Sequence, residues 1–478
     1  MLALWHRRPL TVAAAFVLAL TAWRIGALAA SDLDLFFDEA QYWFWAKNPA
    51  FGYFSKPPVT AWLIGLGTAV AGDTEFGVRL FAPLCYALTA ALGAGIAAAV
   101  YDRRAAAWTA MTLATLPGIS LSAQIASTDV PLLLFWAAAL VCWLRYWQRG
   151  GLWWLGFGLA FGLGLMSKYA MVYVLLCLPV AFLLVPETRS LLRRPGLWLG
   201  LGLGLLLFLP NVWWNWTHEL ASFSHTADNA NWSGPILRPD KLAEFAGAQF
   251  GVMGPILLLA FLWAVVCWRR LGPGERVLAS FAAPVLLLIL TQALISRAHA
   301  NWAAVAYVSA TVLAVGFVLR QGKAHWLGVS LGLHLLAAAV IMHASSIAPS
   351  FGIDPWQRLR GWQAVGDEVA ERLAEMPNAV LTADERSVIA ELLFYVPPQP
   401  PDWVKLRQQA LAQDHYELVS DPSAIGERPV LYVTRSGSAD RLADRFETVE
   451  EQLPIERQRP TRGPETYHVF LLQGFKGD

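Results

Sequence analysis

Long apolar segments are the feature that most constrains what this chain can fold into. Hydrophobic residues make up 56% of the sequence, charged residues only 15%, and there are 23 tryptophans, a composition that soluble domains do not have. A helix needs about 20 apolar residues to cross a bilayer. The sequence predicts about eleven such spans, at 9–30, 76–100, 105–123, 131–148, 151–167, 169–186, 196–213, 249–268, 277–295, 302–319 and 325–343. We therefore expect a polytopic α-helical membrane protein.

The distribution of arginine predicts the orientation of these spans. Basic residues in short loops stay on the cytoplasmic side of a membrane. They occur at every second turn, at Arg7 and Arg8, Arg103 and Arg104, Arg149, Arg189 to Arg194, Arg269 to Arg276, and Arg320 with Lys323. The N-terminus is therefore expected inside, and the first span is expected to be an uncleaved helix, because it is too long for a signal peptide.

The opposite, outer side then receives most of the polar residues that could carry chemistry. It comprises the loops at about 31–75, 124–130, 214–248 and 296–301, and everything after about 344. All four cysteines lie within predicted spans, so no outer thiol pair is expected to form a disulfide or a zinc site. The net charge of +1 gives no indication of a nucleic-acid partner.

The hydrophobic spans stop near residue 345, where a segment of ordinary charge density begins. We expect a transmembrane catalytic domain at 1–345 and a soluble α/β domain at 346–478. Helical periodicity predicts a helix at 362–376, and apolar runs predict strands at 379–382, 429–434 and 467–472. The acids and arginines of this second domain are interspersed, and no catalytic motif is apparent in it.

Acidic residues mark two outer loops. Asp38 and Glu39 precede the aromatic run 42–45, which predicts a short helix at the membrane interface. Asp129 lies at the outer mouth between two spans, where a carboxylate is costly unless it is used. The plainer interpretation is that Asp38 and Glu39 are solvated or cap the following helix. The alternative interpretation is that the acids at the two membrane mouths converge on one active site, which loops 31–75 and 214–248 would form.

Three cations are predicted at the same level as these acids. Lys56 precedes a Pro-Pro pair, Arg79 lies at the outer end of the second span, and Lys168 lies between the fifth and sixth spans. Lys168 is on the side that the positive-inside rule depletes of lysine. Each side chain could simply snorkel to the interface. An anionic ligand at the outer surface would explain all three.

The order of several short motifs resembles one family of membrane enzymes. The motifs are Asp-Glu-Ala-x-Tyr-Trp from residue 38, Gly-Tyr-Phe-Ser-Lys-Pro-Pro from 52, Glu-Phe-Gly-Val-Arg from 75, Thr-Asp-Val-Pro from 128, Met-Ser-Lys-Tyr from 166, Pro-Asn from 210 and Arg-Ala-His-Ala-Asn-Trp from 297. Together they resemble the GT-C membrane glycosyltransferases, and more narrowly the bacterial protein mannosyltransferase and lipid A aminoarabinose transferase superfamily.

The resemblance implies transfer of a sugar from a polyprenyl-phosphate carrier to an acceptor on the outer face, commonly with inversion, and without nucleotide sugars. It implies that Asp38 is the base that removes the acceptor proton. Lys56 and Lys168 would hold the carrier phosphate. Asp129 would position a substrate or share the base role.

The remaining candidates are less sharply defined by the resemblance. Glu39 is a candidate catalytic residue, with a structural role as the alternative. The candidates for contact with the phosphate are Arg79, Arg297, His225 and His299. No metal-ligand set and no cofactor is assigned, although a divalent cation held by His225 and an acid stays open.

Departures from better-known members bear on the substrates. The chain is shorter than the aminoarabinose transferases, and Ser55 stands where they often carry an acid before Lys-Pro-Pro. It also lacks the long lumenal insertion of eukaryotic protein mannosyltransferases. We therefore expect an envelope glycan or lipid A-type acceptor at the periplasmic face of a bacterial inner membrane, with membrane lipid as the surroundings.

Two other classes of function remain as alternatives. A transporter or flippase of lipid-linked sugars would also use many spans and a few buried charges. The acids, however, cluster in outer loops rather than at mid-membrane, and the chain has no matching halves. An envelope scaffold protein would leave Asp38, Lys56 and Asp129 without a role.

Overall fold

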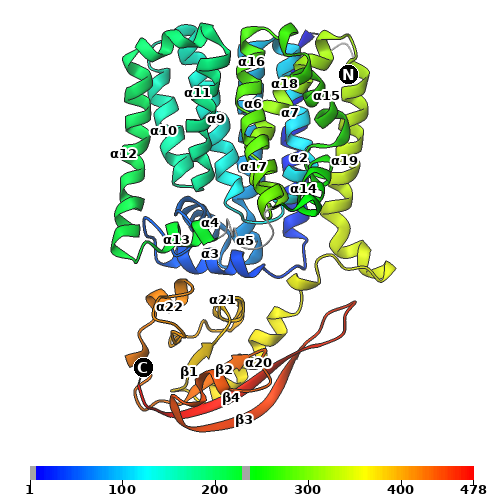
Figure 1. The fold of residues 1–478 in the computed structure, drawn as a ribbon. Coiled ribbons are helices and arrows are strands. Elements are labelled where there is room, and N and C mark those ends of the chain that lie inside the picture. The colour runs from blue at the N-terminus through cyan, green and yellow to red at the C-terminus, as the bar shows by residue number, and fades with distance from the viewer. Residues whose placement is uncertain (1–6, 229–236, 478) are drawn as a thin grey trace.

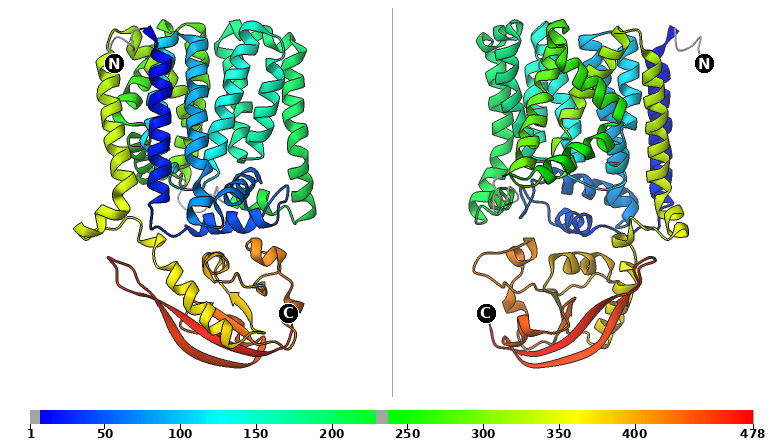
Figure 2. Two further views of the ribbon diagram at one scale, coloured as in Figure 1. Left: turned by 180° about the vertical axis from the view of Figure 1, so that it is seen from behind. Right: turned by 45° about the vertical axis from the view of Figure 1, so that its right-hand side comes forward.

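The computed structural model describes residues 7–228 and 237–477. Helices form one part of the molecule, and the C-terminal residues form a lobe with a small sheet at one end of it (Figure 1; Figure 2). Six helical stretches are long and apolar enough to cross a membrane: α2 (Pro9–Ala29), α5 with α6 (Glu75–Val100), α9 (Asp129–Arg149), α12 (Pro195–Thr217), α16 with α17 (Pro273–Ile295) and α19 with η5 (Ala324–Phe351).

Two further pairs of helices are sharply bent. The first runs over η1 (Tyr169–Tyr173) and α11 (Val174–Leu184) and turns by 118° into η2 (Pro186–Arg193). The second joins α14 (Pro239–Met253) to α15 (Pro255–Val266) at 110°. Counting each pair as one span gives up to eight spans among the described residues.

Shorter helices account for the other predicted spans. The predicted segments 151–167 and 302–319 correspond to α10 (Trp153–Leu165) and α18 (Ala306–Arg320), and 105–123 corresponds to α7 (Arg103–Thr115) and α8 (Pro117–Ser122). Each predicted segment therefore coincides with helix, while length and composition alone support six to eight spans rather than eleven. The prediction of a multi-pass helical membrane protein is confirmed.

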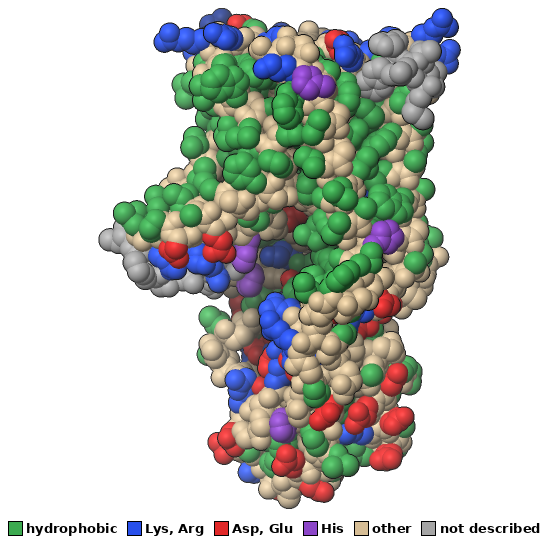
Figure 3. Space-filling view, turned by 90° about the vertical axis from the view of Figure 1, so that its right-hand side faces the viewer, with side chains coloured by type: hydrophobic (Ala, Val, Ile, Leu, Met, Phe, Trp, Pro, Cys, Tyr) green, Lys and Arg blue, Asp and Glu red, His purple; other side chains and the backbone are tan. Residues whose placement is uncertain are grey.

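The surface of the helical part matches this environment. Large apolar side chains are exposed on its outer helices, including Trp213 at 70% and Val266 at 74%, and the apolar side chains form a broad band (Figure 3). Lysine and arginine gather at the end of this part that lies away from the lobe (Figure 3). The glycines of α10 and α12 allow close helix packing, since a Cβ on Gly158 would lie 2.6 Å from the carbonyl oxygen of Gly200.

The predicted outer loop 31–75 contains two helices, α3 (Phe37–Lys47) and α4 (Val59–Ala71). The second predicted loop contains α13 (Ala221–Asp228) and the start of α14, and residues 229–236 lie outside the described part. Between the other helices lie η3 (Trp268–Arg270) and η4 (Ala300–Ala303). The helices α3, α4 and α13 lie where the helical part meets the lobe (Figure 1).

The lobe contains a four-stranded sheet in the order β1-β2-β4-β3. β1 (Val380–Ala383) pairs in parallel with β2 (Val430–Thr434), which pairs antiparallel with β4 (Glu465–Phe475). β3 (Phe446–Arg457) pairs with β4 and was not predicted, because most of its residues are exposed and polar. The helices and turns of the lobe are η6 (Gln357–Leu359), α20 (Trp362–Glu375), α21 (Arg386–Tyr395), α22 (His415–Val419), η7 (Pro422–Ala424) and α23 (Asp440–Ala443).

One hydrophobic core joins α3 to the lobe. Trp43 packs edge-on against Phe394 of α21, with ring centroids 4.8 Å apart, and both belong to one cluster with the inner face of the sheet. Trp43 is 2% exposed and Trp45 1% exposed. The aromatic run is therefore helical as predicted, and its buried side chains pack against the lobe. α3 consequently holds its acidic first turn against α21.

Candidate active site

The candidate residues Asp38, Lys56, Asp129 and Lys168 meet where the helical part faces the lobe. The amino group of Lys56 experiences the charges of Lys168, Asp38 and Asp129. Figure 3 shows a hollow at this level in which basic, acidic and histidine side chains gather. The structure thus brings residues that are up to 130 positions apart within electrostatic reach of one amino group, that of Lys56.

Asp38 is the second residue of α3, and its carboxylate is paired with a residue of the lobe. Its Oδ1 accepts a hydrogen bond of 2.8 Å from Arg386 Nη1, which also donates to Gln41 Oε1. The guanidinium lies over the ring of Phe37. Among the described residues, Asp38 Oδ2 has no hydrogen-bond partner, and the side chain is 38% exposed. One carboxylate oxygen of Asp38 is therefore oriented and the other is open to a ligand.

Asp129 has both carboxylate oxygens engaged. Oδ1 accepts 2.7 Å from Lys168 Nζ, and Oδ2 accepts 2.7 Å from Asn301 Nδ2 on η4. Asp129 is the first residue of α9, and its charge is favourable at a helix N-terminus. Its side chain is 9% exposed and that of Lys168 is 20% exposed. This arrangement fixes Lys168 and leaves Asp129 little capacity to accept a proton from a substrate.

Lys56 is held at the site by a tightly fixed loop. Tyr53 stacks on Trp45, and Ser222 of α13 donates a 2.5 Å hydrogen bond to the carbonyl oxygen of Tyr53. A Cβ at Gly52 would lie 2.6 Å from the ring of Trp214, so only glycine allows this approach. Pro57 and Pro58 then lead into α4.

The side chain of Lys56 is half-buried, and its amino group has no ion-pair partner among the described residues. It makes no hydrogen bond or salt bridge to the residues that the structure describes. Burial and the nearby charge of Lys168 lower the pKa of Lys56 to about 8, although Asp38 and Asp129 oppose this shift. A cation with this pKa, next to a second lysine, is suited to receive an anion.

Two cavities flank the Asp129–Lys168 pair. One, of about 400 Å³, is lined by Lys56, Lys168, Tyr169 and Trp302 among others. The other, of about 410 Å³, is lined mainly by apolar residues with Asp129, His299 and Asn301. Two polar sites with apolar walls can accept the head groups and chains of two amphipathic molecules.

Glu39 and Arg79 lie behind the site and are paired with each other. Arg79 donates from Nε and Nη2 to the two carboxylate oxygens of Glu39, at 3.0 and 2.8 Å, and its other donors bind the carbonyl oxygens of Leu33 and Asp34. Glu39 is 0% exposed and Arg79 3% exposed. Both are saturated and inaccessible, so the geometry favours a structural role and gives no support to catalysis by Glu39 or phosphate contact by Arg79.

The other phosphate candidates lie at different places around the hollow. His299 is exposed, lines the apolar cavity and packs against Trp302. Arg297 is exposed and forms no ion pair within the described ranges. His225 packs edge-on against Phe54, with ring centroids 5.8 Å apart. Of these, His299 lies in the same cavity as Asp129, and His225 lies near the Lys56 loop through its contact with Phe54. No contact places Arg297 at the site among the described residues.

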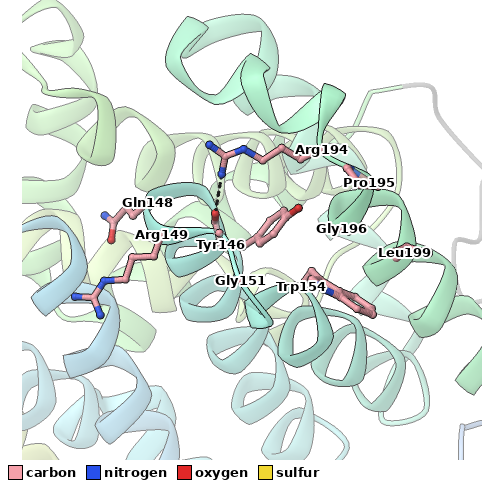
Figure 4. A pocket seen from close by; sticks show the side chains of 10 residues that line it. Tyr146, Gln148, Arg149, Gly151, Trp154, Arg194, Pro195, Gly196 and Leu199 are labelled. Atoms are coloured by element: carbon pink, nitrogen blue, oxygen red, sulfur yellow. Dashed lines mark hydrogen bonds between the residues drawn. The ribbon is translucent and has the colours of Figure 1, made fainter.

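No metal centre emerges from residues 7–228 and 237–477, where no group of three histidine, cysteine or acidic side chains could hold an ion. A further pocket, of about 470 Å³, lies near the opposite end of α9, around Arg149 and Arg194 (Figure 4). Arg194 donates 3.1 Å to the carbonyl oxygen of Tyr146 there. This pocket is lined by none of the predicted site residues.

Two residues of the site were not predicted as such. Asn301 lies within the motif Arg-Ala-His-Ala-Asn-Trp, two residues after His299, and this position was a usable signal. Arg386 lies in the C-terminal segment among interspersed charges and carried no motif. Only the fold places it against Asp38.

Comparisons with known proteins show which family this chain is similar to. The family model described as dolichyl-phosphate-mannose-protein mannosyltransferase matches residues 55–214. Lipid A galacturonosyltransferase RgtD of Rhizobium johnstonii is 36% identical over 389 residues, which cover 79% of this chain and 81% of that protein. An undecaprenyl phosphate-alpha-4-amino-4-deoxy-L-arabinose arabinosyl transferase of Pseudomonas paraeruginosa is 28% identical, over 68% of this chain and 62% of that protein.

A solved structure shares the fold at lower sequence identity. ArnT from Cupriavidus metallidurans in the apo state aligns with a TM-score of 0.65 at 17% identity, covering 95% of this chain and 97% of that one. The same protein has also been solved bound to undecaprenyl phosphate.

Proposed function

Because this chain belongs to the GT-C superfamily of membrane glycosyltransferases, we propose that it transfers a sugar from a polyprenyl-phosphate carrier to a lipid A-type acceptor. The names of its relatives support both substrate classes, since one is a lipid A galacturonosyltransferase and others are undecaprenyl-phosphate aminoarabinose transferases. The observation within this chain that carries the proposal is the open carboxylate oxygen of Asp38 near Lys56, whose amino group is also close to that of Lys168.

The chemistry balances with the residues at the site. An acceptor hydroxyl oxygen forms a bond to the anomeric carbon of the donor sugar, and the bond from that carbon to the phosphate oxygen breaks. The hydroxyl proton goes to a carboxylate, and polyprenyl phosphate leaves with the electron pair. Attack from the side opposite the phosphate inverts the anomeric carbon.

Asp38 is better suited than Asp129 to accept the proton. Arg386 orients Asp38 and leaves Oδ2 open, whereas Lys168 and Asn301 occupy both oxygens of Asp129. Asp129 then acts as a positioning residue for Lys168. The charges on Lys168 and Lys56 stabilise the phosphate as it leaves.

We assign the substrates to cavities from their physical character. The cavity with Lys56 and Lys168 has apolar walls, so the phosphate of the carrier would meet the lysines while its chain stays among apolar side chains. His299 borders the other cavity, where it could contact either substrate.

The topology follows from the same proposal. We place the N-terminus and the arginine-rich end in the cytoplasm of a bacterium, following the positive-inside rule, and the site and lobe in the periplasm at the inner membrane. The short helices α7, α10 and α18 would complete about eleven crossings as members of a packed bundle. The division near residue 345 would separate the membrane domain from a periplasmic α/β domain.

A transfer assay with purified protein in lipid tests this function. A panel of radiolabelled polyprenyl-phosphate sugars is offered with envelope lipid extract, and wild type is compared with Asp38→Asn and with the exposed control Asp240→Asn. We expect label in the lipid extract with wild type and Asp240→Asn, and a loss of at least a hundredfold with Asp38→Asn. Normal turnover by Asp38→Asn would contradict its role as the base.

The same preparation separates transfer from transport. A flippase would move lipid-linked sugar across vesicles without labelling any acceptor. That result would overturn the glycosyltransferase assignment.

A further inference from the structure

A cavity of about 590 Å³ lies between the start of α3 and the lobe, apart from the two cavities beside Lys168. Its walls come from Phe36 and Phe37, from the start of α21, and from the β3–β4 hairpin. Six arginines line it: Arg358, Arg386, Arg435, Arg457, Arg459 and Arg462. A cavity of this size accepts a saccharide with a charged substituent rather than a single small ion.

The acids that line this cavity do not neutralise the arginines. Glu465 accepts from Arg457 at 3.3 Å and lies 3.7 Å from Arg459, and Glu385 lies 3.4 Å from Arg435. Arg358 and Arg462 form no side-chain hydrogen bond or ion pair with any described residue. Both are exposed. Positive charge therefore remains for a ligand.

The third acid, Glu391, has a different character. It is 1% exposed and lines the cavity, and its Oε2 has no hydrogen-bond partner among the described residues. Burial raises the pKa of Glu391 well above its ordinary value, so its negative charge is disfavoured there. An unpaired buried polar atom facing a cavity is a costly feature that a ligand would satisfy.

Arg386 connects this cavity to the candidate base. It lines the cavity, and its Nη1 donates to Asp38. A molecule whose anionic group lies among the arginines would thus have its neighbouring atoms within reach of Asp38. Guanidinium groups bind phosphate oxygens in pairs, so several arginines on one cavity favour this group.

We propose that the arginine cavity binds the acceptor through a phosphate group on its saccharide, and thereby presents a hydroxyl group to Asp38. This inference rests on the proposed function for the identity of the acceptor. It gives the C-terminal lobe a role in selecting the substrate, because an acceptor without phosphate would bind more weakly than a phosphorylated one before any sugar is transferred.

Binding measurements on the full chain in nanodiscs, without donor, test the cavity separately from catalysis. The probes are a phosphorylated glucosamine disaccharide, the same disaccharide without phosphate, and inorganic phosphate, with affinities measured by calorimetry. We expect the phosphorylated disaccharide to bind at least tenfold more tightly than either of the others. Equal affinity of the two disaccharides would overturn the proposal. If inorganic phosphate bound as tightly as the phosphorylated disaccharide, the inference that the cavity also recognises the saccharide would be overturned.

The variant Arg358→Gln with Arg462→Gln removes the two arginines of this cavity whose side chains have no hydrogen-bond or ion-pair partner among the described residues. We expect it to weaken binding of the phosphorylated disaccharide at least tenfold and to leave the phosphate-free disaccharide unaffected. Arg428→Gln is the matched control, because Arg428 pairs with Asp402 in the same lobe and does not line the cavity. Unchanged binding by the double variant would overturn the proposal, and thermal denaturation of each variant verifies that it is folded.

The two proposals fail in different ways. Binding that depends on phosphate and on these arginines, with no sugar transfer from any donor, would contradict the proposed function and leave the cavity as a phosphosaccharide site. Sugar transfer that is equally fast to phosphorylated and phosphate-free acceptors in wild type would support the function and overturn the cavity's role.

Discussion

Arg386 Nη1 lies 2.8 Å from Oδ1 of Asp38, which precedes it by 348 residues. The contact joins the C-terminal lobe to the first turn of α3 and fixes one oxygen of the candidate base. Because the same guanidinium packs over Phe37, it has little freedom to leave Asp38. The lobe therefore contributes a positioning residue directly to the site.

Replacing Arg386 by Gln removes this orientation of Asp38 without removing the carboxylate. We expect kcat to fall at least tenfold while KM for the donor changes less than twofold, because in our proposal Lys56 and Lys168, and not Arg386, hold the donor phosphate. Arg386→Lys should recover only part of the loss, since lysine lacks the planar fork. Steady-state kinetics in nanodiscs provide both constants, with Arg428→Gln as the control. A rise in donor KM with unchanged kcat would contradict a positioning role.

Lys56 predicts a pH dependence of carrier binding. Its pKa is lowered to about 8, so the free protein loses this positive charge as pH rises through 8. A bound phosphate favours the charged form and raises the pKa, so affinity is full below pH 8 and declines above it, toward tenfold per pH unit. Titration with undecaprenyl phosphate between pH 6.5 and 9.5 measures this decline.

The variant Lys56→Arg separates Lys56 from other titrating groups. Arginine stays charged throughout this range, so the affinity of the variant should be flat with pH. A decline of the same size in Lys56→Arg would assign the pH dependence to another group.

The pair of Asp129 and Lys168 predicts coupled effects on transfer. With 2.7 Å between Oδ1 and Nζ and side chains 9% and 20% exposed, removal of either partner frees or misplaces the other. Asp129→Asn and Lys168→Gln should each lower kcat/KM for the donor at least tenfold. The double variant should lose less than the two single losses combined, with a coupling of about 1 kcal/mol or more. Independent, additive losses would show that Asp129 does not act through Lys168.

The sequence predicted the membrane class and the general location of the site because these depend on local properties. Runs of apolar residues identify helices in lipid, and the acids and lysines at span ends were unusual for their environment. The convergence of Asp38, Lys56, Asp129 and Lys168 followed from placing their loops on the same side. The strand β3 was missed because its exposed, polar residues lack the apolar pattern by which the other strands were recognised.

Partners across long separations could not be predicted in the same way. Arg386 belongs to a segment whose charges resemble an ordinary solvated surface, and its contact with Asp38 arises only when α21 packs against α3. Glu39 appeared equivalent to its neighbour Asp38, yet the helix turns it into the protein interior. Adjacent acids on one helix point in directions about 100° apart, so one can face a cavity while the other is buried.

We accordingly expect that a substitution which breaks the pair of Glu39 and Arg79 lowers the stability of the fold and does not remove a chemical step. Each oxygen of Glu39 accepts two hydrogen bonds: Oε1 from Arg79 Nε and the backbone N–H of Ala126, and Oε2 from Arg79 Nη2 and the backbone N–H of Phe36. In Glu39→Gln an amide NH₂ group would face two donors and leave Arg79 without a counter-charge. Disrupting one member of a buried ion pair costs about 3–5 kcal/mol.

We therefore expect Glu39→Gln to lower the denaturation temperature clearly, whereas Glu244→Gln should shift it little. Glu244 pairs with Lys241 on the surface, with side chains 69% and 36% exposed, and such pairs contribute about 1 kcal/mol or less. Thermal unfolding in detergent gives the comparison, and transfer activity normalised to folded protein shows whether chemistry is affected separately. A Glu39→Gln protein with wild-type thermal stability and no transfer activity would return Glu39 to the catalytic residues, because a buried structural pair cannot be disrupted without loss of stability.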